Sequence, residues 1–197
     1  MEQQLDAKFW NERWKTDQAG WDMKSVAPIT RSYFEKYSDK SDAILIPGCG
    51  NAYEAEMLEE LGYQDITIID ISPYLIDKLQ EKFKDSKVIK VVETNFFDWE
   101  GAYDVIFEQT FFCALSPTLR PNYVDKMHAL LKNGGLLVGL LFNRNFEHEG
   151  PPFGGEAAEY KQLFEDNFEF LTFEKSWDSI PPRADTELFI EFRKRSL

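Results

Sequence analysis

Cysteine is scarce in this sequence, since the 197 residues include only Cys49 and Cys113. Two cysteines support neither a disulfide framework nor a cysteine-based zinc site, so we interpret both as small packing thiols and expect no metal. No apolar run reaches the roughly 18 residues that a membrane-spanning helix needs. Residues 1–6 also lack the basic and apolar regions of a secretory signal, and we expect a cytoplasmic protein.

Basic residues are outnumbered, with 22 lysines and arginines against 35 aspartates and glutamates and a net charge of -13. A field of this sign repels the phosphates of nucleic acids and the surfaces of anionic membranes. The one dense basic run, Arg193-Lys-Arg195, has too few charges to offset the rest, and we interpret it as a solvated tail. The composition therefore favours a small-molecule partner and predicts binding to neither nucleic acid nor membrane.

The hydrophobic periodicity alternates between helical and extended along the chain. Helices are predicted over residues 5–15, 28–37, 54–61, 73–83, 119–131 and 156–164, and strands over residues 43–47, 66–70, 88–93, 103–108 and 136–141. We expect Asn51 to cap the helix over 54–61, and Asn133-Gly134-Gly135 to close the helix over 119–131. Extended segments over 168–177 and 186–193 predict a final hairpin.

This alternation predicts a single α/β domain over residues 1–197, with N-terminal cap helices in 1–40 and a core in 41–197. Strands that are continuous in isoleucine, valine and leucine indicate a doubly wound, mostly parallel, Rossmann-like sheet covered on both faces. The hairpin adds one antiparallel strand near the C-terminus. Ligands of such sheets bind outside the carboxyl ends of the strands.

The turn Gly48-Cys-Gly50 follows an apolar strand and precedes a helix, as in folds that cradle a nucleotide. A dinucleotide fingerprint has a third glycine where this chain has Tyr53. Its absence favours S-adenosylmethionine, which has no phosphate and whose amino-acid end would lie against the two glycines. Asp70, at the end of the next strand, would accept hydrogen bonds from the ribose hydroxyls; the alternative is an acid that caps the following turn.

Two further groups of side chains suit this donor. Asn95 would bond the edge of an adenine and Phe96 would pack on its face, because both follow the third strand. Trp10, Trp14 and Trp21 lie within twelve residues, and the faces of such rings attract a sulfonium by about 0.5 to 2 kcal/mol. A tryptophan stripe at helical spacing is also typical of core packing, and composition alone does not separate the two interpretations.

Five segments together carry a resemblance to a known family. They are Phe9-Trp10 with Trp14, Gly20-Trp-Asp22, the run 45–54, the run 103–115, and Leu119-Arg-Pro with Tyr123. In these segments, and over about residues 9–183, the chain resembles the thiopurine S-methyltransferase family. Within that family it is most similar to the halide and thiol methyltransferase branch.

The resemblance implies a class I methyltransferase fold with a seven-stranded sheet, a monomer, and S-adenosylmethionine as methyl donor. It also implies donor contacts from the matching positions, namely Trp10, Trp14, Trp21, Gly48, Asp70, Asn95, Phe96 and Gln109. The chain departs from the family at Gln109, where the halide branch commonly has tyrosine, and at Asn95, where aspartate is usual. We expect Asn95 to keep the adenine contact. The two departures weaken the case for methyl transfer to a halide.

We predict methyl transfer to a small soft nucleophile such as a thiol, a thiopurine-like compound or a halide. Displacement at a sulfonium neutralises charge, so alignment and removal of water matter most, and an anionic acceptor needs no base. Phe111, Phe112 and the loop 149–155, with Pro152 and Phe153, are expected to form the acceptor pocket.

No catalytic residue is required, and the two candidates are weak. Arg120 matches a family position near the acceptor pocket, and its alternative role is a charge at a helix start that pairs with acids. His148 is the candidate base near the loop, although a lone loop histidine is more often solvated. Two other functions stay open: a donor-binding protein without turnover, which Gln109 and Asn95 keep in play, and a nicotinamide-dependent oxidoreductase, which Tyr53 disfavours.

Overall fold

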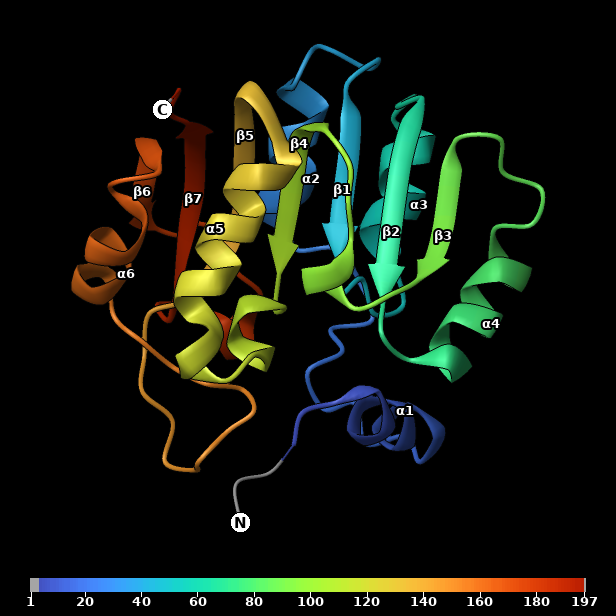
Figure 1. Cartoon of the computed structure of the whole chain (residues 1–197), viewed down its shortest axis with the longest axis horizontal. Coiled ribbons are helices and arrows are strands. Elements are labelled where there is room, and N and C mark those ends of the chain that lie inside the picture. The colour runs from blue at the N-terminus through green and yellow to red at the C-terminus, as the bar shows by residue number, and fades with distance from the viewer. Residues whose placement is uncertain (1–3, 197) are drawn as a thin grey trace.

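A mixed seven-stranded sheet runs through the centre of the molecule (Figure 1). The computed structural model describes residues 4–196. Its strands are β1 (Ala43–Pro47), β2 (Asp65–Asp70), β3 (Ile89–Glu93), β4 (Tyr103–Gln109), β5 (Leu131–Phe142), β6 (Phe168–Lys175) and β7 (Glu187–Lys194). They follow the order β3-β2-β1-β4-β5-β7-β6, in which β7 is antiparallel to both neighbours and the other pairs are parallel. The predicted mostly parallel sheet with one antiparallel strand is confirmed.

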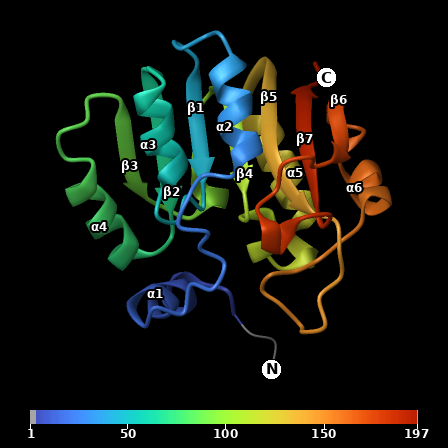
Figure 2. The ribbon, with the colours of Figure 1, turned by 180° about the vertical axis from the view of Figure 1, so that it is seen from behind.

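Helices cover both faces of this sheet (Figures 1 and 2). They are α1 (Ala7–Lys15), α2 (Pro28–Lys36), α3 (Tyr53–Glu60), α4 (Pro73–Lys82), α5 (Arg120–Leu130) and α6 (Ala157–Phe164), with short 3-10 turns η1 (Phe96–Asp98), η2 (Phe112–Ala114), η3 (Pro117–Leu119) and η4 (Pro181–Arg183). Residues of α2, α3 and α4 share one hydrophobic core with the sheet, and residues of α5 and α6 share the other. Every residue of β1 is buried, because both faces of a central parallel strand are covered.

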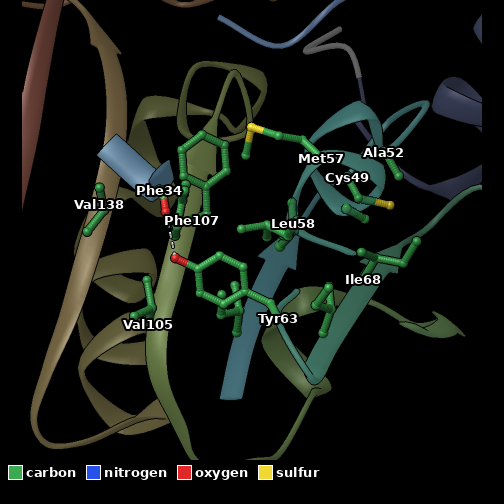
Figure 3. Close-up of a cluster of buried hydrophobic side chains, with 14 of the residues drawn as sticks. Phe34, Cys49, Ala52, Met57, Leu58, Tyr63, Ile68, Val105, Phe107 and Val138 are labelled. Atoms are coloured by element: carbon green, nitrogen blue, oxygen red, sulfur yellow. Dashed lines mark hydrogen bonds between the residues drawn. The ribbon is translucent and has the colours of Figure 1, made fainter. Parts of the chain in front are cut away.

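A buried tyrosine and its neighbour Phe34 tie α2 to the sheet (Figure 3). The hydroxyl of Tyr63 donates a hydrogen bond to the carbonyl oxygen of Phe34 at 3.0 Å. The Phe34 ring packs edge-on against Tyr63 and against Phe107 of β4, with ring centroids 5.7 Å apart in both pairs. A buried hydroxyl is stable only when it is paired, so this contact fixes where α2 lies on the sheet.

The first helix lies beyond the carboxyl ends of β1 and β2, outside the layers of the sheet (Figure 1). Asp6 caps α1 by accepting a hydrogen bond from the backbone N–H of Phe9 at 2.9 Å. On the same helix, Asn11 Oδ1 accepts hydrogen bonds from Ser72 Oγ at 3.1 Å and from the N–H of Tyr74 at 2.9 Å. These bonds attach α1 to the N-terminus of α4, over the strand ends where ligands of such sheets bind.

Two predictions for the first half of the chain differ from the structure. Although the sequence assigns residues 1–40 to a cap, α2 packs on the sheet, because Ile29 and Phe34 give it a buried apolar face. Asn51 does not cap α3. Ala52 holds the cap position with a φ of 55°, and the Asn51 amide instead donates to Asp22 Oδ2 at 2.8 Å.

A third difference lies at the start of β5. The strand begins at Leu131, directly after α5, so the predicted turn Asn133-Gly134-Gly135 lies inside it. Leu131 pairs with Tyr103, and the next pair joins Leu136 to Val105, so the intervening residues bulge. Gly134 supplies the φ of 73° that this bulge requires.

Candidate functional site

A cavity of about 540 Å³ opens at the carboxyl ends of β1, β2 and β4, next to α1. Of the residues singled out from the sequence, its lining includes Trp10, Trp14, Trp21, Gly48, Gly50, Asp70, Asn95, Phe96, Gln109 and Phe111. These residues come from separate segments of the chain. They meet here because the carboxyl ends of parallel strands share one edge of the sheet.

The glycine turn brings bare backbone to the cavity wall. Gly48 and Gly50 have φ angles of 58° and 53°, a left-handed conformation that glycine adopts without strain. A β carbon on Gly48 would lie 2.3 Å from the Phe111 ring, and one on Gly50 would lie 3.6 Å from the Trp14 ring. At Gly48, therefore, no side chain fits between the backbone and the Phe111 ring.

Asp70 ends β2 beside this turn and is buried. Its Oδ1 accepts a hydrogen bond from the N–H of Ser72 at 3.0 Å, so the acid does cap the following turn. Burial raises the pKa of Asp70 to about 6, and the backbone N–H groups of Ser72, Gly50 and Ile71 oppose that rise. The carboxylate is therefore ionised at neutral pH and adds negative charge to the cavity it lines.

Trp10, Trp14 and Trp21 form one aromatic wall of the cavity, which we call the aromatic cap. The Trp21 ring meets Trp10 and Trp14 edge-on, with centroids 5.4 and 5.5 Å away and interplanar angles of 85° and 87°. All three are partly exposed and all three line the cavity. The rings therefore pack on one another and also line the cavity.

Asn95 and Phe96 follow β3 and line the same cavity. Asn95 Oδ1 accepts a hydrogen bond from the N–H of Phe97 at 3.1 Å and so caps η1. The buried Phe96 ring packs edge-on against Phe111, with centroids 5.1 Å apart. Trp99, which the sequence assigns to the core, does not line the cavity, and it packs against the hydrophobic core.

The residues after β4 form an apolar end of the cavity, lined by Phe111, Ala114, Leu115 and Leu119. Phe112 is not among them, in contrast to the prediction. Its buried ring packs against Tyr123 and Tyr160, with centroids 4.9 and 5.4 Å away. The reason is a tight turn, in which Glu108 accepts hydrogen bonds from the N–H groups of both Phe111 and Phe112 at 2.8 and 3.0 Å. That turn leaves only Phe111 in the cavity wall.

Pro152 and Phe153 also lie outside the cavity lining, again in contrast to the prediction. The N–H of Phe153 donates to the carbonyl oxygen of Cys113 at 2.7 Å, and Arg120 Nη2 donates to the carbonyl oxygen of Gly154 at 2.6 Å. These two bonds attach the loop to η2 and to the start of α5. The loop is therefore held beside the cavity rather than in its wall.

Neither weak catalytic candidate reaches the cavity lining. The buried Arg120 guanidinium pairs with Glu159 at 2.6 Å and lies over the Phe112 ring, 4.9 Å from its centroid. This is the alternative role, a charge at a helix start that pairs with an acid. His148 is exposed, and its Nδ1 accepts a hydrogen bond from the N–H of Gly150 at 3.0 Å.

Asp6, which caps α1, also lines the cavity, as do two acids to which the sequence assigned no site role, Asp22 and Glu54. Asp22 Oδ2 accepts hydrogen bonds from Asn51 Nδ2 at 2.8 Å and from the Tyr53 hydroxyl at 3.2 Å. Glu54 is buried in the first turn of α3, and burial raises its pKa to about 7. Their positions in the sequence were the signal that could have identified them, because Asp22 directly follows Trp21 and Glu54 faces inward just after the glycine turn.

The charge of the lining suits a cationic ligand. Within residues 4–196 the lining contains four acids and no lysine, arginine or histidine. Such a wall attracts a sulfonium and an ammonium group and has no cationic side chain for a pyrophosphate. The volume lies in the usual range of small-molecule sites, about 300 to 1,000 Å³. The glycine turn, the acid at the end of β2 and the aromatic cap therefore fit S-adenosylmethionine better than a dinucleotide.

Both cysteines are free and buried. No cluster of three or more histidine, cysteine, aspartate or glutamate side chains is arranged to bind a metal in the part of the chain that the structure describes. Among those same residues, no helix has the length and apolarity to cross a membrane.

Known proteins resemble this chain over nearly its whole length. A profile of the family described as Thiopurine S-methyltransferase (TPMT) matches residues 5–192. A "Probable thiol methyltransferase 2" of Arabidopsis thaliana is 30% identical over 193 residues, which cover 95% of this chain and 85% of the relative. A "Thiopurine S-methyltransferase" of Acinetobacter baylyi is 25% identical, with 84% and 86% covered.

Solved structures share the fold. A Burkholderia thailandensis 1,6-didemethyltoxoflavin-N1-methyltransferase with bound S-adenosylhomocysteine superimposes with a TM-score of 0.75 at 15% identity, covering 96% of this chain and 87% of that one. TehB from Haemophilus influenzae gives a TM-score of 0.70 at 18% identity, with 94% and 67% covered. At these identities the likeness concerns the fold alone. The profile match over residues 5–192 and the 30% identical relative show that the chain belongs to the thiopurine S-methyltransferase family of S-adenosylmethionine-dependent methyltransferases.

Proposed function

We propose that this protein methylates the sulfur of a small thiol, or a comparable soft nucleophile, with S-adenosylmethionine held in the cavity. One observation carries the proposal: the lining combines two chemically different parts, a donor end with the acids and the aromatic cap and an apolar end with the side chains that follow β4. The acidic end suits a cationic donor. The apolar end suits an acceptor that gives up its water readily. The relatives named as thiol and thiocyanate methyltransferases support the same acceptor class.

In this proposal each part of the donor end has its own task. The backbone of Gly48 and Gly50 lies along the amino-acid portion of the donor, and Asp70 accepts hydrogen bonds from its ribose hydroxyls. Asn95 and Phe96 hold the adenine by its edge and its face. The aromatic cap stabilises the positive sulfur through its ring faces.

The chemistry asks little of the protein beyond these contacts. When bound, S-adenosylmethionine supplies an electrophilic methyl group. Phe111, Leu115 and Leu119 exclude water from the acceptor, and the rigid strand ends align it. An acceptor that arrives as a thiolate needs no general base.

Two measurements test the function. S-adenosylhomocysteine should raise the melting temperature and NADH should not, because only a ligand that binds the folded state stabilises it. Hydrosulfide, small thiols, thiopurines, thiocyanate and iodide should then be offered with a methyl-labelled donor, and the thiols should give methylated product. An Asp70→Ala variant serves as the control for donor binding. Binding without product across this panel would leave a donor-binding protein and refute the proposed turnover.

We further propose that the enzyme works as a cytoplasmic monomer without nucleic acid. Two free, buried thiols suit a reducing compartment. The net charge of -13 opposes binding to nucleic acid. Light scattering after size-exclusion chromatography measures the mass directly, and a dimer mass at micromolar concentration would contradict the monomer.

A further inference from the structure

Gln109 carries an unpaired amide in the cavity wall. Its Nε2 and Oε1 atoms are buried, and neither has a hydrogen-bond partner. Among the described side chains with such unpaired buried atoms, Gln109 is the one that lines the cavity. Buried polar groups of folded proteins are nearly always paired, so two free atoms on one side chain indicate the position of a ligand group.

The place of Gln109 in the fold identifies that ligand group. It is the last residue of β4, the strand that lies next to β1 and its glycine turn. Two residues further along the chain, Phe111 begins the apolar end, and its ring lies against Gly48. The amide therefore lies at the boundary between the donor end and the apolar end, where a methyl group would pass between them.

We propose that Gln109 recognises the methyl acceptor by donating a hydrogen bond from Nε2 to an anionic sulfur, that of a thiolate or a hydrosulfide ion. The inference rests on the proposed function and names the residue that selects its acceptor. An amide N–H stabilises an anion without adding a second charge. This matters in a cavity whose described lining holds acids and no cationic side chain. This assigns Gln109 to the acceptor rather than to the donor contact that the family resemblance implies.

The reaction then balances without a proton transfer. An electron pair of the acceptor sulfur forms the new bond to the methyl carbon as the bond from that carbon to the donor sulfur breaks. The electrons of the broken bond remain on the departing thioether, so an anion and a cation give two neutral products. Because the lining lacks positive side chains, the anion should bind well only when a positive donor is already in place.

The test compares Gln109→Leu with Asn95→Leu, which makes the same amide-to-alkyl change at the donor end. Sinefungin, an unreactive donor analogue with an amine in place of the sulfonium, provides a positive complex whose affinity calorimetry measures. Thiocyanate binding to that complex is followed by tryptophan fluorescence, and the KM for hydrosulfide is measured with the true donor. Gln109→Leu should raise the thiocyanate Kd and the hydrosulfide KM about tenfold or more, as expected for a lost bond to a charged group. Its sinefungin Kd should change little.

Asn95→Leu should do the reverse, weakening sinefungin and sparing thiocyanate once the complex is saturated. Gln109→Glu should oppose the anion more strongly than Gln109→Leu, and Gln109→Met replaces the leucine variant if that variant does not fold. The inference is overturned if Gln109→Leu weakens sinefungin and leaves both acceptor readouts unchanged, or if thiocyanate does not bind the wild-type complex. Thiocyanate binding that depends on Gln109, in a protein that methylates no thiol, would support the anion site and refute only the proposed turnover.

Discussion

Arg183 donates a hydrogen bond from Nη2 to the backbone carbonyl oxygen of Trp21 at 2.9 Å, across 162 positions of sequence. Its Nη1 pairs with Glu187 at 3.3 Å, and both side chains are buried. The guanidinium also lies over the ring of Phe142, 5.2 Å from its centroid. The turn before β7 thus holds the backbone of the aromatic cap in place.

Removing this contact should weaken donor binding at a distance. Loss of Arg183 alone would leave Glu187 buried and unpaired, at a cost of about 3 to 5 kcal/mol, so the informative variant is Arg183→Met with Glu187→Gln. We expect its Kd for S-adenosylhomocysteine, measured by calorimetry, to rise about threefold to tenfold, the worth of one hydrogen bond.

The control for this variant is Arg193→Met, which breaks an exposed pair with Glu169 on the same hairpin. That pair contributes little to stability because both charges are solvated, so the donor affinity should stay at the wild-type value. An unchanged Kd in the double variant would mean that other contacts hold Trp21.

Donor affinity should depend on pH through Asp70. Burial raises the pKa of Asp70 to about 6, so the ionised fraction of the carboxylate falls as the pH drops from 7 to 5. The protonated acid is the weaker acceptor for ribose hydroxyls. The Kd for S-adenosylhomocysteine should therefore rise on acidification, and Asp70→Asn should bind about tenfold more weakly at pH 7.

Calorimetry at pH 5, 6 and 7 on both proteins isolates this effect. Glu54, whose pKa burial raises to about 7, also titrates in this window, so the wild-type profile alone does not identify the group. The ratio of the two dissociation constants should approach one as the pH falls toward 5. A ratio that is constant over the window would show that Asp70 does not bind the donor through its charge.

Those parts of the fold that depend on local sequence could be predicted. The strand over 43–47 is found at its predicted bounds, because a strand buried on both faces is an uninterrupted apolar run. The helix predicted from residue 73 begins there, with Pro73 as the first residue of α4 and Ser72 as its cap. The glycine turn and Asp70 at the end of β2 are local in the same sense, and so their positions in the fold could be predicted from the chain alone.

The acceptor end depends on contacts that no local pattern contains. Phe111 and Phe112 have the same chemistry, and only the bonds that Glu108 accepts from their N–H groups decide which ring lines the cavity. The bond from Arg120 to the carbonyl of Gly154 likewise joins residues 34 positions apart and holds the loop beside the cavity. Such long-range bonds also placed Leu131 opposite Tyr103, against the helix and turn that the sequence favoured.

The two glycines of the turn should respond differently to alanine. Both have a left-handed backbone, so each variant bears a strain of about 1 to 2 kcal/mol. Only at Gly48 does the new methyl collide, since its β carbon would lie 2.3 Å from the Phe111 ring, against an ordinary 3.6 Å from Trp14 at Gly50. Displacement of Phe111 should lower kcat/KM for a thiol about tenfold to a hundredfold below Gly50→Ala.

Steady-state kinetics on the two purified variants, with melting temperatures as the measure of strain, tests this prediction. Similar melting temperatures with a much lower kcat/KM for Gly48→Ala would identify Phe111 as part of the acceptor wall. Equal kinetic losses would show instead that only the backbone conformation of the turn matters.

Glu108→Gln should change how stability depends on pH. Glu108 is buried, and it accepts hydrogen bonds from the N–H groups of Phe111 and Phe112 and from the Tyr123 hydroxyl. Burial raises its pKa from 4.5 to about 7. The folded state therefore holds a proton that the unfolded chain releases between about pH 4.5 and 7, and this group's contribution to the free energy of unfolding falls as the pH rises.

Glutamine keeps an oxygen for the two N–H groups and cannot ionise. Relative to wild type, the free energy of unfolding of Glu108→Gln should therefore increase across pH 4.5 to 7, by up to about 3 kcal/mol. Urea denaturation of both proteins at pH 5, 6, 7 and 8 measures this difference directly. Other buried acids contribute equally to both curves and cancel, so two parallel curves would mean that Glu108 is already ionised at pH 5 and that its bonds to the turn outweigh its burial.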